Sequence, residues 1–410
     1  MDHFITEIKI EKLRHLSGID IKLNPEYRQH LILTGKNGSG KTSLLMALQK
    51  YLRAVNKNDL TELYSIYIPE KLLAEQAVEK SQTPAEKRRA EGSYRAWSAR
   101  VSEYKDGVDI EFSRRDDIDD LYQKGEFITA FFPANRKAEI VRAHGVEDIK
   151  LNDFYAIDTD PGKLLQKYMV HLKTQQAYAK NENENEVADK IQQWFDRFVE
   201  ALRILLDDES IKLEYDYKDY NFKIHEAGRE PFGFDALSDG YSSVIHIVSD
   251  LILRMDHNWL LKGELSEYNV EGIVLIDELE THLHIELQKK IMPFLTKFFP
   301  RIQFIVTTHS PYILNSISNV KIYDLERCIE MENLCAYTSD SLAEGYFGAD
   351  EYSDELKRKL ERYQFLKEKN ALTEKEKAEC AELQIELKNI PKTLSPEAWE
   401  RFAEIEGEPW

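Results

Sequence analysis

The sequence contains no apolar run of the roughly 18 residues or more that would mark a membrane-spanning helix. Its N-terminus, MDHFITEIKI, carries charges where a secretory signal needs an apolar stretch. Both absences argue against a membrane or secreted protein. We therefore expect a cytoplasmic protein without a membrane partner.

Cysteine is also scarce: the 410 residues include only three, Cys328, Cys335 and Cys380. An odd number at no metal-ligand spacing fits a reducing compartment better than a disulfide framework or a zinc site. The chain is 42% hydrophobic, which is enough for one large core or two smaller ones. These numbers indicate a globular protein.

Positive charge is the third shortage, since 55 Lys and Arg stand against 74 Asp and Glu, a formal net charge of −19. Such a chain repels a phosphate backbone on average, so contact with nucleic acid would need a local basic patch. One candidate is EKRRAEGSYRAWSAR (86–100), in which basic residues are interspersed with Tyr94 and Trp97. Such a segment could bind a nucleic-acid strand through charge and base stacking. The alternative is a solvated helix face with two half-buried rings, which the neighbouring acids favour.

The sequence does contain a strand, a glycine-rich loop and a helix in succession. HLILTG (30–35) is a short apolar run ending in glycine, and the leucines of the following segment, from Leu44 to Leu52, recur at helical spacing. The loop between them, GKNGSGKT (35–42), matches the P-loop pattern in full. Its glycines let backbone N–H groups surround phosphate oxygens at a helix N-terminus. We therefore expect a nucleotide site at this loop.

Two side chains of the loop have specific expected roles. Lys41 would neutralise the β- and γ-phosphates of the nucleotide, and the Thr42 hydroxyl would ligate Mg²⁺. Within the loop, the expected nucleotide contacts are Gly35, Asn37, Gly38, Ser39, Gly40, Lys41, Thr42 and Ser43.

Two carboxylates follow a second predicted buried strand, and a carboxylate at such a strand end could bind Mg²⁺. GIVLID (272–277) is an apolar run that ends in Asp277, and Glu278 comes directly after it. A P-loop needs a carboxylate on a neighbouring strand to hold Mg²⁺, which is the role expected of Asp277. Glu278 would then reach the γ-phosphate and take a proton from the attacking water, or orient it.

Two further motifs extend this site. RIQFIVTTHS (301–310) is a buried strand that runs into His309, which could sense the γ-phosphate or could instead be a core histidine. LSDGY (237–241) is a Ser-x-Gly turn that opens an apolar helix, so Ser238 and the Gly240 backbone could bind a phosphate. Alone, the second motif would indicate only an N-capped helix.

Taken in order, these motifs resemble those of the ABC-type ATPases, in particular the soluble branch of SMC-, RecF- and OLD-like proteins. GKNGSGKT resembles Walker A, LSDGY the signature, IVLIDE Walker B, LETHLH the D-loop and TTHS the switch. The resemblance covers about residues 1–55 and 210–325. It implies an α/β P-loop NTPase of ABC type, whose mixed or parallel sheet is accompanied by an antiparallel β subdomain, helical insertions and a helical C-terminal tail.

The resemblance also implies a mechanism. The P-loop of one subunit and the signature of a second would enclose ATP and Mg²⁺ in a head-to-tail dimer, with Ser238 and Gly240 contacting the nucleotide in trans. Glu278 would be the catalytic carboxylate and His309 the switch. Arg14, in EKLRHL, falls where this branch often has an arginine near the nucleotide.

The chain departs from the family pattern in two places. Asp239 and Tyr241 replace the usual glycine and glutamine of the signature, which predicts a weaker phosphate contact and slow turnover. A clear Q-loop glutamine is absent, and FFPANR, with Asn135 and Arg136, occupies the expected region with an open role.

The remaining sequence suggests how the chain is divided. The expected parts are a first head segment at 1–55, a helical insertion at 56–105, completing strands at 106–160, a helical hairpin at 161–208, a second head segment at 209–325 and a charged helical tail at 326–410. We expect the tail to be a pair of helices that serves assembly or partner docking. Thr373 and Glu376 predict a capping box at the start of one of them.

Three functions compete at this point. The segment after His309 shows no strand-borne glutamate with a later Asp-x-Asp pair, so we expect no built-in Toprim nuclease. The chain is similar to the ATPase subunits of the Septu and PARIS anti-phage defence systems, which implies an ATP-hydrolysing regulator of a separate HNH or Toprim effector nuclease, with higher oligomers left open. The alternatives are a RecF-like DNA-binding repair ATPase and, less consistent with the missing Q-loop, the nucleotide-binding subunit of a transporter.

Overall fold

The central element of the fold is a six-stranded sheet in the order β11-β10-β3-β9-β8-β5. The computed structural model describes residues 2–136, 140–262, 270–332, 334–339, 341–342, 354–369, 371–388 and 396–406. The strands of this sheet are β3 (His30–Thr34), β5 (Phe127–Phe132), β8 (Glu271–Ile276), β9 (Ile302–Thr307), β10 (Val320–Asp324) and β11 (Ile329–Met331). All neighbours pair in parallel except β11, which is antiparallel to β10. Because β9 lies between β3 and β8, the strand before Asp277 is not a direct neighbour of the strand before the P-loop, and the expectation of a carboxylate on a neighbouring strand was wrong.

A smaller antiparallel sheet accompanies the first, in the order β2-β1-β4. It consists of β1 (Ile5–Leu13), β2 (Leu16–Lys22) and β4 (Val108–Phe112). In parts of β1 and β2 the buried side chains alternate with half-buried or exposed ones, as expected of a sheet with one solvated face. The strands of the parallel sheet are instead buried almost throughout, which explains their continuous apolar runs.

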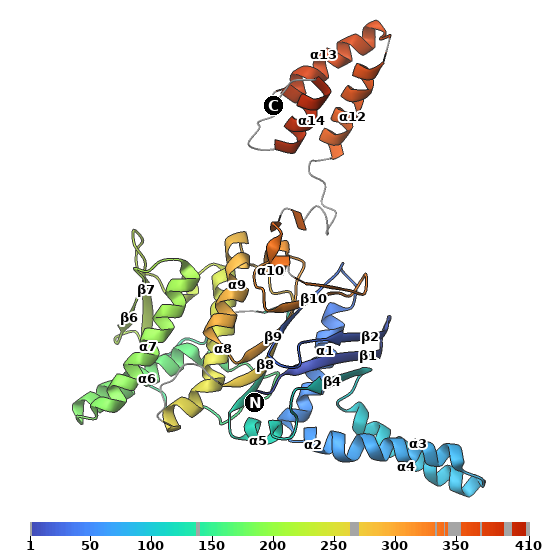
Figure 1. Cartoon of the computed structure of the whole chain (residues 1–410). Coiled ribbons are helices and arrows are strands. Elements are labelled where there is room, and N and C mark those ends of the chain that lie inside the picture. The colour runs from blue at the N-terminus through green and yellow to red at the C-terminus, as the bar shows by residue number, and fades with distance from the viewer. Residues whose placement is uncertain are drawn as a thin grey trace. The chain divides into compact units, whose positions relative to one another are not determined.

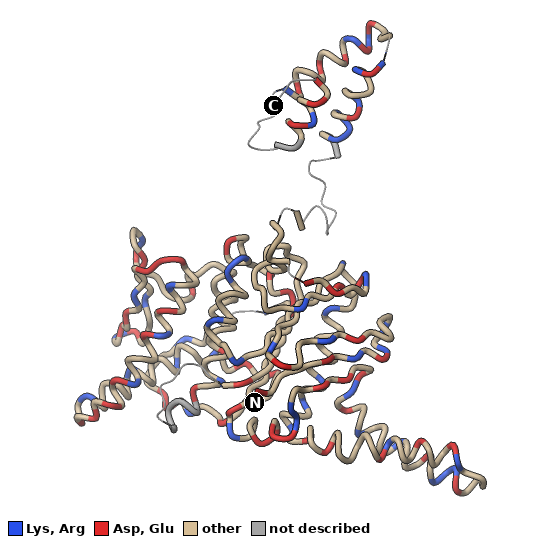
Figure 2. Tube along the Cα trace, viewed as in Figure 1, with Lys and Arg blue, Asp and Glu red and all other residues tan. Residues whose placement is uncertain are grey.

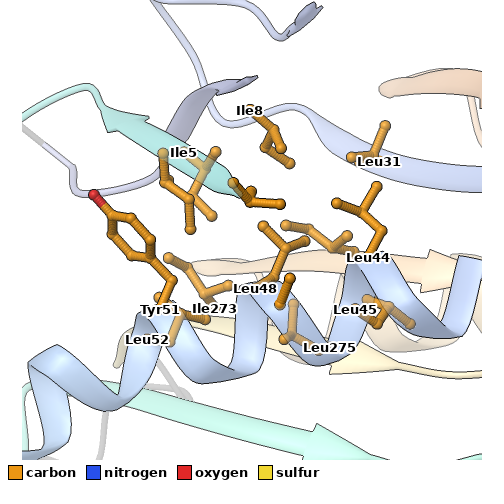
Figure 3. Close-up of a cluster of buried hydrophobic side chains, with 14 of the residues drawn as sticks. Ile5, Ile8, Leu31, Leu44, Leu45, Leu48, Tyr51, Leu52, Ile273 and Leu275 are labelled. Carbon is orange, nitrogen blue, oxygen red and sulfur yellow. The ribbon is translucent and has the colours of Figure 1, made fainter. Parts of the chain in front are cut away.

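Helix α1 (Lys41–Asn56) packs against both sheets in one hydrophobic cluster. Figure 3 shows Leu44 and Leu48 of this helix beside Ile5 and Ile8 of β1 and Ile273 of β8. Leucines at i and i+4 lie on one face of a helix, so a single stripe reaches both sheets. The first residue of this well-anchored helix is Lys41, which fixes the position of the P-loop.

Two pairs of helices extend from the two sheets (Figure 1). The first is α3 (Ile68–Lys80) with α4 (Pro84–Ser102), preceded by the short α2 (Leu60–Glu62) and a π-helical turn at Leu63–Tyr67. The second is α6 (Leu165–Asn181) with α7 (Asn185–Leu206), which begins after a 3₁₀ turn at Pro161–Leu164 and matches the predicted helical hairpin. Trp194 and Phe198 of α7 are buried and stacked, so the apolar stripe of the hairpin packs within this unit.

The other elements complete the frame around the site. They are α5 (Ile118–Gln123), the β6–β7 hairpin (Lys212–Asp216 and Asn221–His225), a 3₁₀ turn at Phe234–Ala236, α8 (Asp239–Lys262), α9 (Ile285–Phe298) and α10 (Pro311–Leu314). The strands of the β-hairpin pair in antiparallel register, from Lys212 with His225 to Asp216 with Asn221. Each helix in the described part of the chain is too short or too polar to span a membrane.

The chain forms two compact units, Met1–Ala336 and Tyr337–Trp410. The boundary lies later than the predicted one, after Leu325, because β11 and a 3₁₀ turn at Leu334–Ala336 still belong to the first unit. The described residues of the second unit include α12 (Asp354–Glu368), α13 (Glu374–Lys388) and α14 (Pro396–Glu406), and so more helices than the predicted pair. Tyr363 and Phe402 pack in its small core. The predicted capping box forms, since Thr373 Oγ1 accepts from Glu376 N–H over 3.3 Å and the Glu376 carboxylate accepts from Thr373 N–H over 2.9 Å.

Candidate nucleotide site

The P-loop runs from the end of β3 to the start of α1 and needs glycine at several positions. Gly35, Gly38 and Gly40 have φ of +125°, +85° and +101°, values that are costly for residues with a Cβ. Space is a second constraint at Gly40, where an added Cβ would lie 2.8 Å from Cδ1 of Leu16 in β2. The loop conformation is therefore specified by its glycines and by the antiparallel sheet beside it.

Lys41 lies buried under this loop. Its Nζ donates to the carbonyl oxygens of Gly35 over 2.7 Å and Lys36 over 3.0 Å. Burial lowers the pKa of Lys41, while the carboxylates of Glu278 and Glu280 act in the opposite direction. A partly desolvated ammonium that donates to loop carbonyls can exchange these acceptors for phosphate oxygens with little reorganisation of the loop.

The carboxylates after β8 are brought to the same edge of the sheet. Asp277 is buried, and its Oδ1 accepts from Thr307 Oγ1 over 2.7 Å. The same Thr307 oxygen accepts from Glu278 N–H over 2.7 Å, so one hydroxyl at the end of β9 orients both acidic residues. Glu278 has φ of +45°, a conformation that costs a non-glycine residue about 1–2 kcal/mol. Backbone strain of this kind is concentrated at functional sites.

The residues around the switch contain polar atoms that are buried and lack partners among the described residues. They are Ser39 Oγ in the P-loop, Glu280 Oε2 after Walker B and His309 Nε2 after β9. Glu280 uses its other oxygen to accept from His309 N–H over 2.6 Å. Burial and the charge of Lys41 lower the pKa of His309, so its imidazole is neutral near pH 7. These unsatisfied atoms fit a polar ligand such as a phosphate and its attacking water.

The signature turn lies at the start of α8. Ser238 is exposed, and its carbonyl accepts from Ser242 N–H over 2.9 Å. Gly240 is packed on the D-loop, where an added Cβ would lie 2.5 Å from His282 O. Among the described residues, no hydrogen bond or ion pair joins Ser238 or Gly240 to residues 35–43 of the same chain.

Arg14 is located in the turn between β1 and β2, with φ of +53°. Its side chain is exposed, while the next residue, His15, has Nε2 within 3.2 Å of Ser39 O. The turn therefore touches the P-loop backbone, and Arg14 lies beside it.

Sequence reasoning missed Thr307 and left the role of Arg136 open. Arg136 is buried, and its guanidinium donates to the Asp277 carbonyl over 2.7 Å and to Ser243 Oγ over 3.0 Å. A threonine before the TTHS switch histidine was visible in the sequence, but its partner depends on the pairing of Ile276 with Val306 between β8 and β9.

The sheet, the loop and the carboxylates define a P-loop ATPase. Residues 65–315 match the family described as "AAA domain, putative AbiEii toxin, Type IV TA system". Since the match covers more than half of the 410 residues, the chain belongs to this family of AAA-domain ATPases.

The curated relatives confirm the expected resemblance to defence-system ATPases. The chain is 31% identical over 180 residues to Septu protein PtuA of Bacillus mycoides (strain KBAB4), which covers 41% of this chain and 24% of that protein. It is 39% identical over 90 residues to the Retron Ec83 probable ATPase of Escherichia coli, which covers 22% of this chain and 16% of that protein. The matches thus span no more than about a quarter of the length of these relatives.

Among solved structures, an Smc head bound to the C-winged helix domain of ScpA has 15% identity and a TM-score of 0.38, over 82% of this chain and 95% of that one.

Proposed function

We propose that this ATPase binds ATP with Mg²⁺ at residues 35–43, hydrolyses it slowly and uses it to dimerise head-to-tail, and that it thereby controls a separate effector nuclease in anti-phage defence. The observation that supports the site best is the convergence of Lys41, Asp277 and Glu278, with Thr307 orienting both acids. Charge of both signs and unsatisfied polar atoms gather at the carboxyl edge of a parallel sheet, where ligands bind in open α/β folds.

Each residue has a proposed task. Thr42 and Asp277 would hold Mg²⁺, whose charge offsets that of the phosphates. Lys41 binds the β- and γ-phosphates. Glu278 accepts a proton from the attacking water or orients it. The neutral His309 contacts the γ-phosphate through Nε2, which has no partner among the described residues.

The position of the signature supports the dimer. Ser238 is exposed and, among the described residues, forms no hydrogen bond with its own P-loop, so it is proposed to reach the nucleotide bound by a second copy. Two incomplete half-sites make ATP a ligand of the dimer, and its hydrolysis releases the copies. Arg14, beside the P-loop, is proposed to contact the same nucleotide.

The effector is proposed from the relatives. Septu protein PtuA and the retron probable ATPases are parts of named defence systems, and this chain is similar to each of them over part of its length. The second unit, Tyr337–Trp410, folds around its own core and is the proposed docking module for the effector or for further copies.

The dimer is tested by solution mass. With Mg²⁺ and a non-hydrolysable ATP analogue, the parental chain should shift to a dimer or larger assembly and capture a nuclease encoded beside it. Ser238→Arg should keep ATP affinity within about twofold but lose the shift, because the added charge is introduced only into the trans contact. Ser210→Arg, at an exposed serine before β6, is the matched control and should dimerise normally. A Ser238→Arg protein that dimerises like the parent would contradict the trans assignment, and a parent that captures no nuclease would contradict the effector role.

One observation favours RecF-like DNA binding as the second candidate. Lys87, Arg88 and Arg89 are exposed on α4 and form no ion pair with described residues, although the chain carries a net charge of −19. Figure 2 shows acidic residues on the same arm, which weaken this patch. Trp97 packs against Tyr67, with ring centroids 6.1 Å apart, and so contributes to the arm itself.

If this arm binds DNA, reversing the charge of Lys87, Arg88 and Arg89 to glutamate should abolish most of the affinity. The salt dependence, as the slope of log K against log salt, should fall by about 3, because three phosphate contacts are lost. Fluorescence anisotropy with a duplex in the presence of ATP measures both values. Lys150→Glu, at an exposed loop lysine, is the control. A parental protein that binds no duplex would eliminate this candidate.

A further inference from the structure

Arg136 is the residue that connects the two halves of the site. It follows β5 and is 8% exposed. Its Nη1 donates to Asp277 O over 2.7 Å, and its Nη2 donates to Glu278 O over 3.1 Å and Leu279 O over 3.3 Å. Its Nε donates to Ser243 Oγ, in the first turns of α8, over 3.0 Å. One guanidinium therefore holds both the Walker B turn and the signature helix.

The geometry is specific to arginine. Guanidinium presents five N–H donors in a rigid plane, and a fourth carbonyl, that of Pro133, accepts from Nη1 over 3.3 Å. Burial lowers the pKa of Arg136 to about 10, while Glu280, Asp277 and Glu278 act in the opposite direction, so the group stays charged near neutral pH. A lysine ammonium at this position could not reach the Walker B carbonyls and Ser243 together.

The first turns of α8 are tightly packed at Ser243 and Gly240, and they also border a pocket. Ser243 is 3% exposed, and Gly240 leaves no room for a Cβ against His282 O. Beside these contacts lies a pocket of about 590 Å³, lined by residues that include Arg136, Asp239, Ser242 and His282. A displacement of the Walker B turn would therefore be passed to α8 through Arg136, with free volume to accommodate it.

We propose that Arg136 is a positioning residue that transmits occupancy of the P-loop site to the signature turn, so that Ser238 and Gly240 are presented to the second copy only when the first has bound ATP. This inference rests on the proposed function. It assigns to the FFPANR segment the coupling between the nucleotide site and the dimer interface.

The test is hydrogen–deuterium exchange of residues 238–245 with and without ATP and Mg²⁺, at a protein concentration where mass photometry shows monomers. ATP should slow exchange in this segment of the parental chain. Ser243→Ala removes one bond and leaves the three Walker B carbonyl bonds, so it should fold. We expect its ATP affinity to stay within about twofold, its ATP-induced slowing of exchange to be lost and its kcat to fall about tenfold. Arg136→Lys should do the same or more, whereas Arg142→Gln, at an exposed arginine on the same pocket, should match the parent.

The outcomes separate this inference from the proposed function. If Ser243→Ala keeps the full exchange response and kcat, and changes only the melting temperature, Arg136 has a structural role and the inference is wrong. A parental chain whose segment 238–245 ignores ATP also overturns it. If the parental response is present and lost in Ser243→Ala, but the parent never dimerises, the coupling stands and the head-to-tail function fails.

Discussion

Replacing Lys41 with alanine should reduce ATP hydrolysis by at least about 10²–10³-fold and weaken ATP binding by about 10–150-fold. The ammonium is buried beneath the P-loop, where among the described residues it donates to the carbonyls of Gly35 and Lys36, and alanine removes this charge. Hydrogen bonds to charged groups are typically worth about 1.5–3 kcal/mol, and removing one preorganised donor to developing charge costs about 10²–10³ in kcat. Titration calorimetry with ATP and a phosphate-release assay measure the two effects.

Lys36→Ala is the matched control for this prediction. Lys36 belongs to the same loop, but its Nζ faces solvent and pairs with Glu326 over 2.9 Å. Surface ion pairs of this kind contribute little, so its removal should change neither binding nor turnover by more than about twofold. If Lys41→Ala and Lys36→Ala bound ATP equally well, the loop would not be the nucleotide site.

The local motifs explain why the places of the candidate site residues in the fold were predictable. A parallel strand that is buried on both faces has a continuous apolar sequence, and a charged or glycine-rich break marks its carboxyl end. This pattern placed the P-loop after β3 and Asp277 after β8, as the structure has them. The glycine positions were equally informative, because Gly38 and Gly40 adopt the positive φ that the P-loop pattern requires.

The contacts between distant segments could not be predicted in this way. The guanidinium of Arg136 selects the carbonyls of Asp277 and Glu278, which lie in a different part of the sequence, and backbone acceptors have no sequence signature. Thr307 orients both carboxylates only because Ile276 pairs with Val306. The contacts of Thr307 therefore depend on the register between β8 and β9. Sequence periodicity does not specify this register, because both strands are mostly apolar.

The number of helices in the tail was not predicted correctly, for a different reason. We predicted two helices there, and α14 forms a third. Ala398 and Phe402 are its buried positions in the described residues, too few to show a helical period in a short charged segment. The first unit extends to β11 for a related reason: a three-residue edge strand has no pattern of its own and is defined by pairing with β10.

Glu278→Gln should bind ATP as the parent does but hydrolyse it about 10²–10⁴-fold more slowly, the usual contribution of a positioned general base. The substitution keeps the size of the side chain and the Glu278 N–H bond to Thr307, so the strained turn should persist. Without turnover the ATP-bound dimer should accumulate, because hydrolysis is the step that releases it. Phosphate release and solution mass with ATP and Mg²⁺ measure both consequences.

Glu280 is the competing base, and the same assay distinguishes the two. Its Oε1 accepts from His309 N–H, and its Oε2 has no partner among the described residues, so it is also a carboxylate with an oxygen available to a water molecule. If Glu278→Gln hydrolysed ATP at the parental rate while Glu280→Gln did not, Glu280 would be the base and Glu278 a structural residue of the turn. We expect the reverse ranking, with Glu280→Gln impaired by less, because an amide oxygen can still accept from His309 N–H. Glu286→Gln, at an exposed glutamate in the first turn of α9, controls for the loss of one negative charge and should leave turnover unchanged.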